Sequence, residues 1–212
     1  MSDRGKGPLP VATISKIMKW PKLILASSSP RRVHLLKQVG ADFIVKPVPI
    51  DEDIPVMADP SKLAEELAWR KARAAQDLWG KRYGLRYILG ADTVVSFRHH
   101  LLGKPQSRRQ AASMLRLLSG QRHQVITGLC LIAPDGRMAC GSQISTVLFR
   151  DLNRSQITAY VRTGEPMDKA GAYGIQGQGA LLVKAISGCY FNVVGLPLVL
   201  LDEMIDFLRK RR

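Results

Sequence analysis

The stretch Lys22-Leu-Ile-Leu-Ala-Ser-Ser-Ser-Pro-Arg-Arg32 joins a short apolar strand to the start of a helix. Four consecutive apolar residues form the strand. Ser29 and Pro30 then have the residue types preferred at a helix cap and at the first helical position. Apolar residues recur at helical spacing until Gly40. The stretch therefore predicts a strand that turns directly into a helix.

The segments after this unit first repeat the alternation and then add hairpins. Strands are predicted over 43–48, 87–95, 123–133, 181–186 and 190–194, and a partner strand is predicted to run from the turn at 134–136 toward Phe149. Helices are predicted over 59–79 and from the capping residues Ser107 and Asn153 onward, with a last helix from Pro197. This order predicts an α/β fold with a mixed central sheet and helices on both faces, and it leaves the strand order undefined.

Length and composition restrict the class of protein. A chain of 212 residues suits one domain or one domain of two lobes, and its 46% apolar and 23% charged residues exclude a disordered or fibrous protein. No apolar run is long enough for a transmembrane helix, and the N-terminal residues lack the apolar core of a secretory signal. The three cysteines have no metal-like spacing. We therefore expect a cytoplasmic protein with reduced thiols.

The chain is strongly basic, with 32 Lys and Arg against 17 Asp and Glu and a net charge of +15. About half of this excess lies in residues 1–22 and 209–212, where solvated basic tails are expected. The remaining charge favours polyanionic ligands such as nucleotides or nucleic acid.

The turn over residues 27–32 is a candidate phosphate site. Free backbone N–H groups at the start of a helix carry partial positive charge, and the hydroxyls and the guanidinium groups of Arg31 and Arg32 lie beside them. The alternative is ordinary helix capping with a solvated arginine pair.

Asp92 is a carboxylate within the apolar strand Gly90-Ala-Asp-Thr-Val-Val95. A buried charge needs a partner, so we expect Asp92 at the end of the strand, where it faces a site and binds a metal ion or activates water. The alternative is a structural Asp that accepts hydrogen bonds from neighbouring backbone. Lys104, in Gly103-Lys-Pro105, could bind phosphate. The acidic turn 51–53 could supply ligands to a metal ion. The alternative for both is that the side chains are simply solvated.

Residues 164–179 contain five glycines together with polar and aromatic side chains. Glycine permits a close approach of the backbone to a ligand, and long loops in compact domains are often functional. We interpret the segment as a binding loop, with a flexible surface loop as the alternative.

Six segments in order give the chain its resemblance to a known family. They include Leu25-Ala-Ser-Ser-Ser-Pro-Arg-Arg32, Gly90-Ala-Asp-Thr-Val-Val95 and Asp168-Lys-Ala-Gly-Ala-Tyr-Gly-Ile-Gln-Gly177, with shorter matches at 103–105, 118–128 and 194–197. Together they resemble the Maf (septum-formation) family of nucleoside triphosphate pyrophosphatases. The resemblance covers residues 22–208 and leaves an N-terminal extension, 1–21, and a C-terminal tail, 209–212, outside it.

The resemblance implies a two-lobed fold related to inosine triphosphate pyrophosphatases, with the nucleotide in a cleft between the lobes. It implies hydrolysis of a nucleoside triphosphate to the monophosphate and pyrophosphate with a divalent metal ion, Mg²⁺ or Mn²⁺. The Ala-Asp-Thr sequence at 91–93 is similar to the dTTP/UTP branch. A homodimer is expected, whereas a membrane association or specific nucleic-acid binding is not.

The resemblance also assigns individual residues. Asp92 matches the proton acceptor, and Arg31, Thr93 and Gln176 match positions tied to substrate choice. Further polar positions of the cleft are matched by Ser27, Arg32, Glu52, Lys71, Lys104, Asp168 and Lys169. Among these we expect Lys71 and Lys104 to act with Asp92 in catalysis. Ser27, Arg31, Arg32 and Lys104 are expected to bind phosphate, and Glu52 to bind the metal ion with Asp92.

Two other functions stay open at this point. The basic charge is compatible with a nucleic-acid-binding or cell-division regulatory protein whose cleft is vestigial, and the substrate could instead be 7-methyl-GTP or another non-canonical nucleotide. The presence of Asp92, Lys104 and Gln176 favours an active enzyme.

Overall fold

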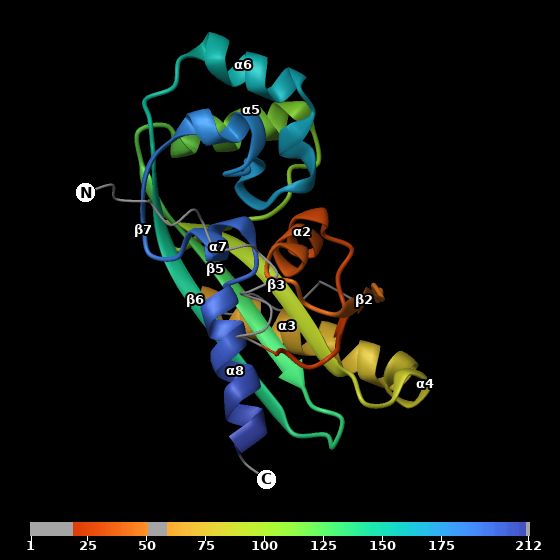
Figure 1. Cartoon of the computed structure of the whole chain (residues 1–212). Helices are drawn as coiled ribbons and strands as arrows, with labels where there is room; N and C mark the ends of the chain where they lie inside the picture. The colour runs from red at the N-terminus through yellow and green to blue at the C-terminus, as the bar shows by residue number, and fades with distance from the viewer. Residues whose placement is uncertain (1–18, 51–58, 211–212) are drawn as a thin grey trace, which may run out of the picture.

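A computed structural model describes residues 19–50 and 59–210, and within them seven strands form one mixed sheet (Figure 1). The strands are β1 (Leu23–Leu25), β2 (Phe43–Val45), β3 (Tyr87–Phe97), β4 (His100–Leu102), β5 (Arg122–Ile132), β6 (Met138–Phe149) and β7 (Val183–Ser187). Their order is β2-β1-β3-β5-β6-β7, with β4 paired to β3. The pairs β1–β2 and β1–β3 are parallel, and the remaining pairs are antiparallel.

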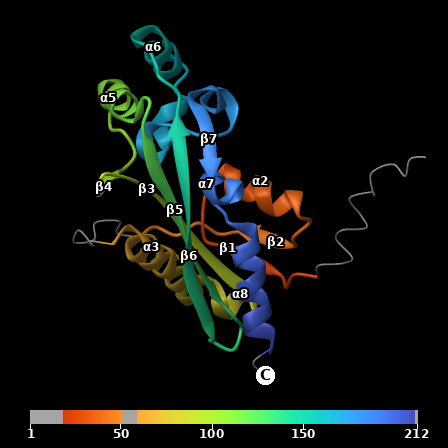
Figure 2. The ribbon, with the colours of Figure 1, turned by 90° about the vertical axis from the view of Figure 1, so that its left-hand side faces the viewer.

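Helices cover both faces of this sheet, as predicted from the sequence. They are α2 (Pro30–Gln38), α3 (Pro60–Ala75), α4 (Lys81–Tyr83), α5 (Arg108–Leu118), α6 (Arg154–Arg162), α7 (Tyr190–Val194) and α8 (Leu198–Lys210). A π-helical turn, Gln76–Gly80, links α3 to α4. Figure 2 shows α3 on one side of the long strands and α2, α7 and α8 on the other.

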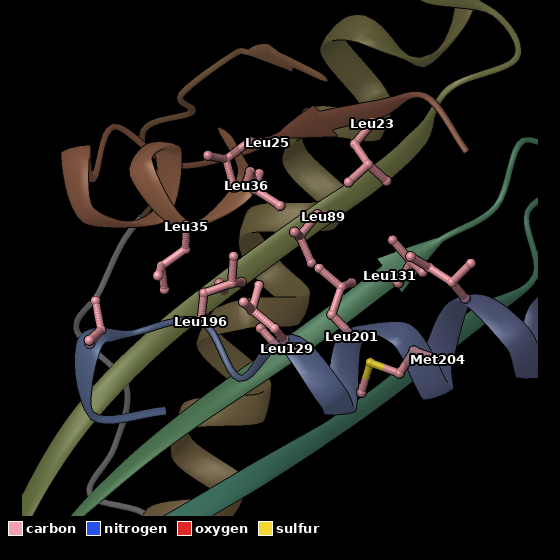
Figure 3. Close-up of a cluster of buried hydrophobic side chains, with 14 of the residues drawn as sticks. Leu23, Leu25, Leu35, Leu36, Leu89, Leu129, Leu131, Leu196, Leu201 and Met204 are labelled. Atoms are coloured by element: carbon pink, nitrogen blue, oxygen red, sulfur yellow. The ribbon is translucent and has the colours of Figure 1, made fainter. Parts of the chain in front are cut away.

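The alternation of side chains along each strand explains the two layers, because successive residues point to opposite faces. Leu23 and Leu25 of β1 and Leu89 of β3 pack with Leu35 of α2 and Leu201 of α8 in one buried cluster (Figure 3). The intervening residues of the same strands, Ile24 and Ile88, pack against Ala68, Ala72 and Ala75 of α3 on the opposite face.

A further buried cluster occupies the other end of the long strands. Val95, Val125 and Phe149 pack there with residues of α5 and α6. Figure 1 shows these helices, and the blue turns that follow α6, at one end of β3, β5 and β6. The strands therefore run through two lobes, each with its own core, in agreement with the two-lobed fold that the resemblance implies.

Two glycines let α3 lie directly on the sheet. A Cβ atom added to Gly90 would lie 2.0 Å from the carbonyl oxygen of Ala68, and one added to Gly128 would lie 2.2 Å from that of Ala64. Side chains at these positions are therefore excluded, and the small residues of α3 complete the close packing.

The predicted strand over 190–194 is wrong, because these residues form helix α7. The chain leaves the sheet before this point: Gly188 has a φ of +116°, and Ser145 Oγ is hydrogen-bonded to both the N–H and the carbonyl of Cys189. A short apolar run does not distinguish a strand from a buried helical turn.

The cysteines also differ from expectation. Cys130 and Cys140 are register partners on β5 and β6, with Cα atoms 4.2 Å apart, and they form a disulfide. The prediction of three reduced thiols is therefore wrong for this pair, whereas Cys189 is free. Pairing across an antiparallel ladder could not be deduced without the strand register.

The expected N-terminal extension lies outside the described residues, except for its last part. Trp20 is half-buried against the core, and its Nε1 donates to Asp202 Oδ1 on α8 at 2.6 Å. Of the predicted basic tail, residues 211–212 fall outside the described range. None of the helices in residues 19–50 and 59–210 combines the length and apolar composition that a membrane crossing requires.

Candidate active site

The cleft lies where β3 has no neighbour on its β1 side. Strand β1 pairs with β3 only as far as Leu89, and β4 pairs with it only from Val95 onward. Asp92 and Thr93 fall within this gap. The expectation that Asp92 stands at the end of its strand is therefore wrong. It is in the middle of β3, and it reaches the cleft because the flanking strands are short.

The cleft contains a polar cavity of about 310 Å³ between the two lobes. It is lined by the turn after β1, the first turn of α2, the middle of β3, one residue of α3, and loops of the second lobe. Eight of the predicted site residues lie on its wall: Ser27, Arg31, Arg32, Lys71, Asp92, Thr93, Lys104 and Asp168.

A smaller cavity of about 50 Å³ adjoins the first and shares Arg31, Thr93 and Ala170 with it. Its wall also contains Lys169 and Gln176. The structure thus brings together ten of the eleven predicted site residues. The eleventh, Glu52, lies outside the described residues, together with the rest of the acidic turn 51–53.

Asp92 is paired with Lys71 at the base of the larger cavity. Lys71 Nζ lies 2.5 Å from Asp92 Oδ1, and the two side chains are only 12% and 15% exposed. Lys71 comes from α3, which approaches the sheet over Gly128, the register partner of Asp92. The close packing of α3 therefore places an ammonium group beside the carboxylate and offsets the cost of its burial.

The two arginines at the start of α2 have different surroundings. Arg32 is buried, and it donates to Gly195 O at 2.8 Å, Ser27 Oγ at 2.9 Å and Thr93 Oγ1 at 3.1 Å. Arg31 lines both cavities and forms an ion pair with Asp168 at 3.3 Å. Arg32 thus braces the turn, whereas Arg31 faces the open cleft. Ser29 is at the cap position of α2 but makes no capping hydrogen bond.

A chain of hydroxyl groups continues from Arg32 into the sheet. Thr93 Oγ1 lies 2.9 Å from Thr127 Oγ1, and Thr127 Oγ1 donates to the carbonyl of Asn192 at 2.9 Å. The hydroxyl proton of Thr127 is used in that bond, so Thr93 donates to Thr127 while it accepts from Arg32. The side chain of Thr93 is therefore held in one orientation.

The second lobe contributes cations and an acid to the cleft. Lys169 Nζ donates to Asp168 Oδ1 at 2.6 Å and to the carbonyl of Glu165 at 2.5 Å. Burial alone would raise the pKa of Asp168, but Lys169 and Arg31 together lower it below its ordinary value. Lys104 is exposed on the loop after β4 and makes no polar side-chain contact with any described residue. Its ammonium group is therefore available to a ligand.

His123 lies behind the smaller cavity. Its Nε2 is hydrogen-bonded to the hydroxyl of Tyr173 at 2.7 Å, and its ring contacts Phe149 edge-on. Burial lowers the pKa of His123 to about 4, so the ring is neutral at pH 7. Burial also raises the pKa of Tyr173, a residue that lines the smaller cavity.

Comparison with known families decides what kind of cleft this is. A family model described as "Maf-like protein" matches residues 22–208.

The chain belongs to the Maf family.

Curated members of the Maf family are close to it in sequence. A dTTP/UTP pyrophosphatase of Geobacillus sp. (strain WCH70) is 49% identical over 177 residues, which cover 84% of this chain and 92% of the relative. A dTTP/UTP pyrophosphatase of Thermococcus kodakarensis is 48% identical over 182 residues, or 86% and 94% of the two chains. Among solved structures, the Staphylococcus aureus Ham1 protein matches with a TM-score of 0.48 and 16% identity, over 90% of this chain and all of that one.

The donor set of this Maf cleft is compatible with a divalent metal ion held mainly by its substrate. The described residues contain no cluster of three or more His, Cys, Asp or Glu side chains that could form a complete protein site. Mg²⁺ usually takes one or two carboxylates and completes its coordination with phosphate oxygens and water. Asp92, on the cavity wall, is one such carboxylate.

Sequence reasoning missed three polar residues that organise the Maf site. Asn192 is fully buried and bonds to Thr127, Val125 and Ser145. Glu165 and Tyr160 are hydrogen-bonded to each other and to the backbone around Gln176. The spacing of glycines after Glu165 was a usable signal. Asn192, in contrast, lies in an apolar run that we interpreted as a strand.

Proposed function

We propose that this protein hydrolyses dTTP and UTP to the corresponding monophosphate and pyrophosphate. The observation that carries the proposal is the Lys71–Asp92 pair at the base of a cleft lined with cationic side chains. Relatives almost half identical over nearly their whole length, named dTTP/UTP pyrophosphatase, support the same activity.

The triphosphate binds along the larger cavity. Arg31 and Lys104 supply charge from opposite lobes, and Lys71 supplies it from α3. These cations offset about four negative charges on the nucleotide, and they stabilise the charge that develops on the pyrophosphate leaving group. Ser27 and Arg32 fix the turn that carries Arg31, and Arg32 contributes its charge from the cavity wall.

Asp92 orients a water molecule and accepts its proton. The water oxygen attacks the α-phosphorus, the bond between that phosphorus and the bridging oxygen breaks, and pyrophosphate leaves with the bridging oxygen. Lys71 holds the carboxylate in place from 2.5 Å. General-base catalysis of this kind contributes about 10²–10⁴-fold in rate.

A divalent cation is the proposed cofactor, either Mg²⁺ or Mn²⁺. Asp92 and Glu52 would hold it together with the phosphate oxygens of the substrate, and it would neutralise charge and polarise the α-phosphate as a Lewis acid.

The smaller cavity receives the base. The amide of Gln176 has one donor and one acceptor group, which match the imide edge of thymine or uracil. Thr93 and Arg31 connect this cavity to the phosphate site, because both line the two cavities. The enzyme would act on the cytoplasmic nucleotide pool, and we propose a homodimer as its assembly.

A panel of nucleoside triphosphates tests this function. Each is incubated with the protein and Mg²⁺ or Mn²⁺, and pyrophosphate is measured separately from orthophosphate. We expect dTTP and UTP to be the best substrates, with pyrophosphate as the direct product. Orthophosphate as the sole direct product would contradict the proposed bond cleavage. A preference for 7-methyl-GTP would contradict the proposed specificity for a pyrimidine nucleotide.

A further inference from the structure

The carboxylate of Glu165 is the centre of a small hydrogen-bonded cluster at the start of the glycine-rich segment. Its Oε1 accepts from the hydroxyl of Tyr160 at 3.0 Å and from the N–H of Gly179 at 3.1 Å, while Oε2 accepts from the N–H of Gln178 at 3.1 Å. The same tyrosine hydroxyl accepts from the N–H of Gly174 at 3.3 Å. The cluster therefore holds the backbone on both sides of Gln176.

The glycines of this segment fit the cluster closely. A Cβ atom added to Gly177 would lie 3.0 Å from Glu165 Oε2, and Gly177 has a φ of +68°. A Cβ atom added to Gly179 would lie 2.7 Å from the hydroxyl of Tyr160 and 2.1 Å from the carbonyl of Gly174. The glycine spacing is thus required for the chain to wrap around Glu165 and Tyr160, and it does not indicate a loose loop.

The segment held by the cluster reaches the cleft through Gly174, Ile175 and Gln176, and of these three only Gln176 has a polar side chain. Gln176 lines the smaller cavity, whereas Glu165 and Tyr160 line neither the smaller nor the larger cavity. We propose that Glu165, supported by Tyr160, is a positioning residue that fixes Gln176 and thereby sets the preference for a pyrimidine base. This inference rests on the proposed function, because it names the residues that tune the base site.

The chemistry of the cluster requires a carboxylate. All three groups around it are donors, namely two backbone N–H groups and one hydroxyl. Burial raises the pKa of Tyr160, and its hydrogen bond to Glu165 raises it further, so the hydroxyl stays protonated and able to donate. A glutamine at 165 would have nearly the same shape, but its NH₂ group would face one of these donors.

The variants E165Q and Y160F test the inference, with E203Q as the matched control. Glu203 is exposed on α8 and has no place in the site. Hydrogen exchange of the backbone amides of 177–179 reports the positioning directly, and kinetics with dTTP and dGTP report its consequence. We expect faster exchange in E165Q. We also expect kcat/KM for dTTP to fall about tenfold, mainly through a higher KM, and dTTP to be preferred over dGTP less strongly.

Y160F removes the hydrogen bond to Glu165 and the one from the N–H of Gly174, but it leaves the carboxylate bonded to the N–H groups of Gln178 and Gly179. It should show the same changes to a smaller degree, whereas E203Q should behave like the wild type. Unchanged exchange and unchanged dTTP preference in E165Q would overturn the inference alone. A loss of kcat with KM and base preference intact would also overturn it, because a positioning role at the base site does not act in that way. A wild-type protein that neither binds nor hydrolyses pyrimidine triphosphates would overturn the proposed function, and this inference with it.

Discussion

Asp92 illustrates how single residues in this fold depend on partners that are distant in sequence. The motif around it could be recognised from residue types alone, and so could the polar turn at 27–32. Its partner Lys71 was indicated only by the family resemblance, because its own surroundings in an alanine-rich helix gave no signal. The packing of α3 brings it within 2.5 Å of the carboxylate. The same limit applies to Asn192, which meets Thr127 through a helix that looked like a strand.

The variant D92N tests the proposed base. Asparagine keeps the shape of the side chain but cannot accept a proton, so we expect turnover of dTTP to fall at least about a hundredfold. The fold should persist, and circular dichroism should show a cooperative melting transition. The control D206N changes an exposed residue of α8 in the same way and should retain full turnover. Near-normal turnover in D92N would exclude Asp92 as the base.

His123 makes folding stability depend on pH. Its pKa is about 4 in the folded protein and about 6.5 in an unfolded chain, so the unfolded state binds more protons between these values. The contribution of His123 to the free energy of unfolding is fully present above pH 6.5 and is lost as the pH falls toward 4. The total loss is about 3 kcal/mol.

Urea unfolding of the wild type and H123Q at about pH 7, 6 and 5 measures this contribution. H123Q should be less stable at neutral pH, and its stability should fall less steeply on acidification. The exposed His34 provides a control, since H34Q should keep the slope of the wild type. Equal slopes in wild type and H123Q would show that His123 is not the group responsible.

The catalytic pair depends on how helix α3 packs on strands β3 and β5. Strand and helix positions were largely predictable from periodicity and capping residues, as at Ser107 and Asn153, whose side chains accept from the N–H groups of Gln110 and Gln156. Their spatial arrangement was not predictable, because the crossing of α3 over Gly90 and Gly128 is set by contacts between segments far apart in the chain.

The variant G128A tests this crossing. A Cβ atom at this position would meet backbone atoms of Ala64 and Glu65 at 2.2–2.5 Å, so α3 must move. We expect a loss of about 1–3 kcal/mol in the free energy of unfolding and a clear loss of turnover, because Lys71 moves with the helix. G103A, where no atom lies within 4 Å of the added carbon, should keep its stability. Wild-type stability in G128A would refute the close packing.

For the molecule as a whole, two lobes with separate cores meet at a cleft that collects positive charge. Arg31 and Lys71 come from one lobe and Lys104 and Lys169 from the other, in a chain of net charge +15. The basic composition predicted a polyanionic ligand, but it did not indicate where the ligand binds. That information came from the topology, which leaves β3 uncovered between β1 and β4.

Substrate affinity should therefore depend on ionic strength. Screening shortens the reach of charge interactions to about 10 Å at 0.1 M salt and to about 3 Å at 1 M. We expect KM for dTTP to rise several-fold between about 0.05 and 0.5 M KCl, while kcat changes little. Rates measured at saturating Mg²⁺ would separate this effect from metal binding. A KM that does not respond to salt would contradict a charge-based phosphate site.

Hydrolysis of dTTP in water enriched in ¹⁸O tests the central claim most directly. If Asp92 directs water to the α-phosphorus, mass spectrometry will find one ¹⁸O atom in dTMP and none in the pyrophosphate. Label in the pyrophosphate, or in orthophosphate released directly from the nucleotide, would show that water attacks a different phosphorus and would contradict the account.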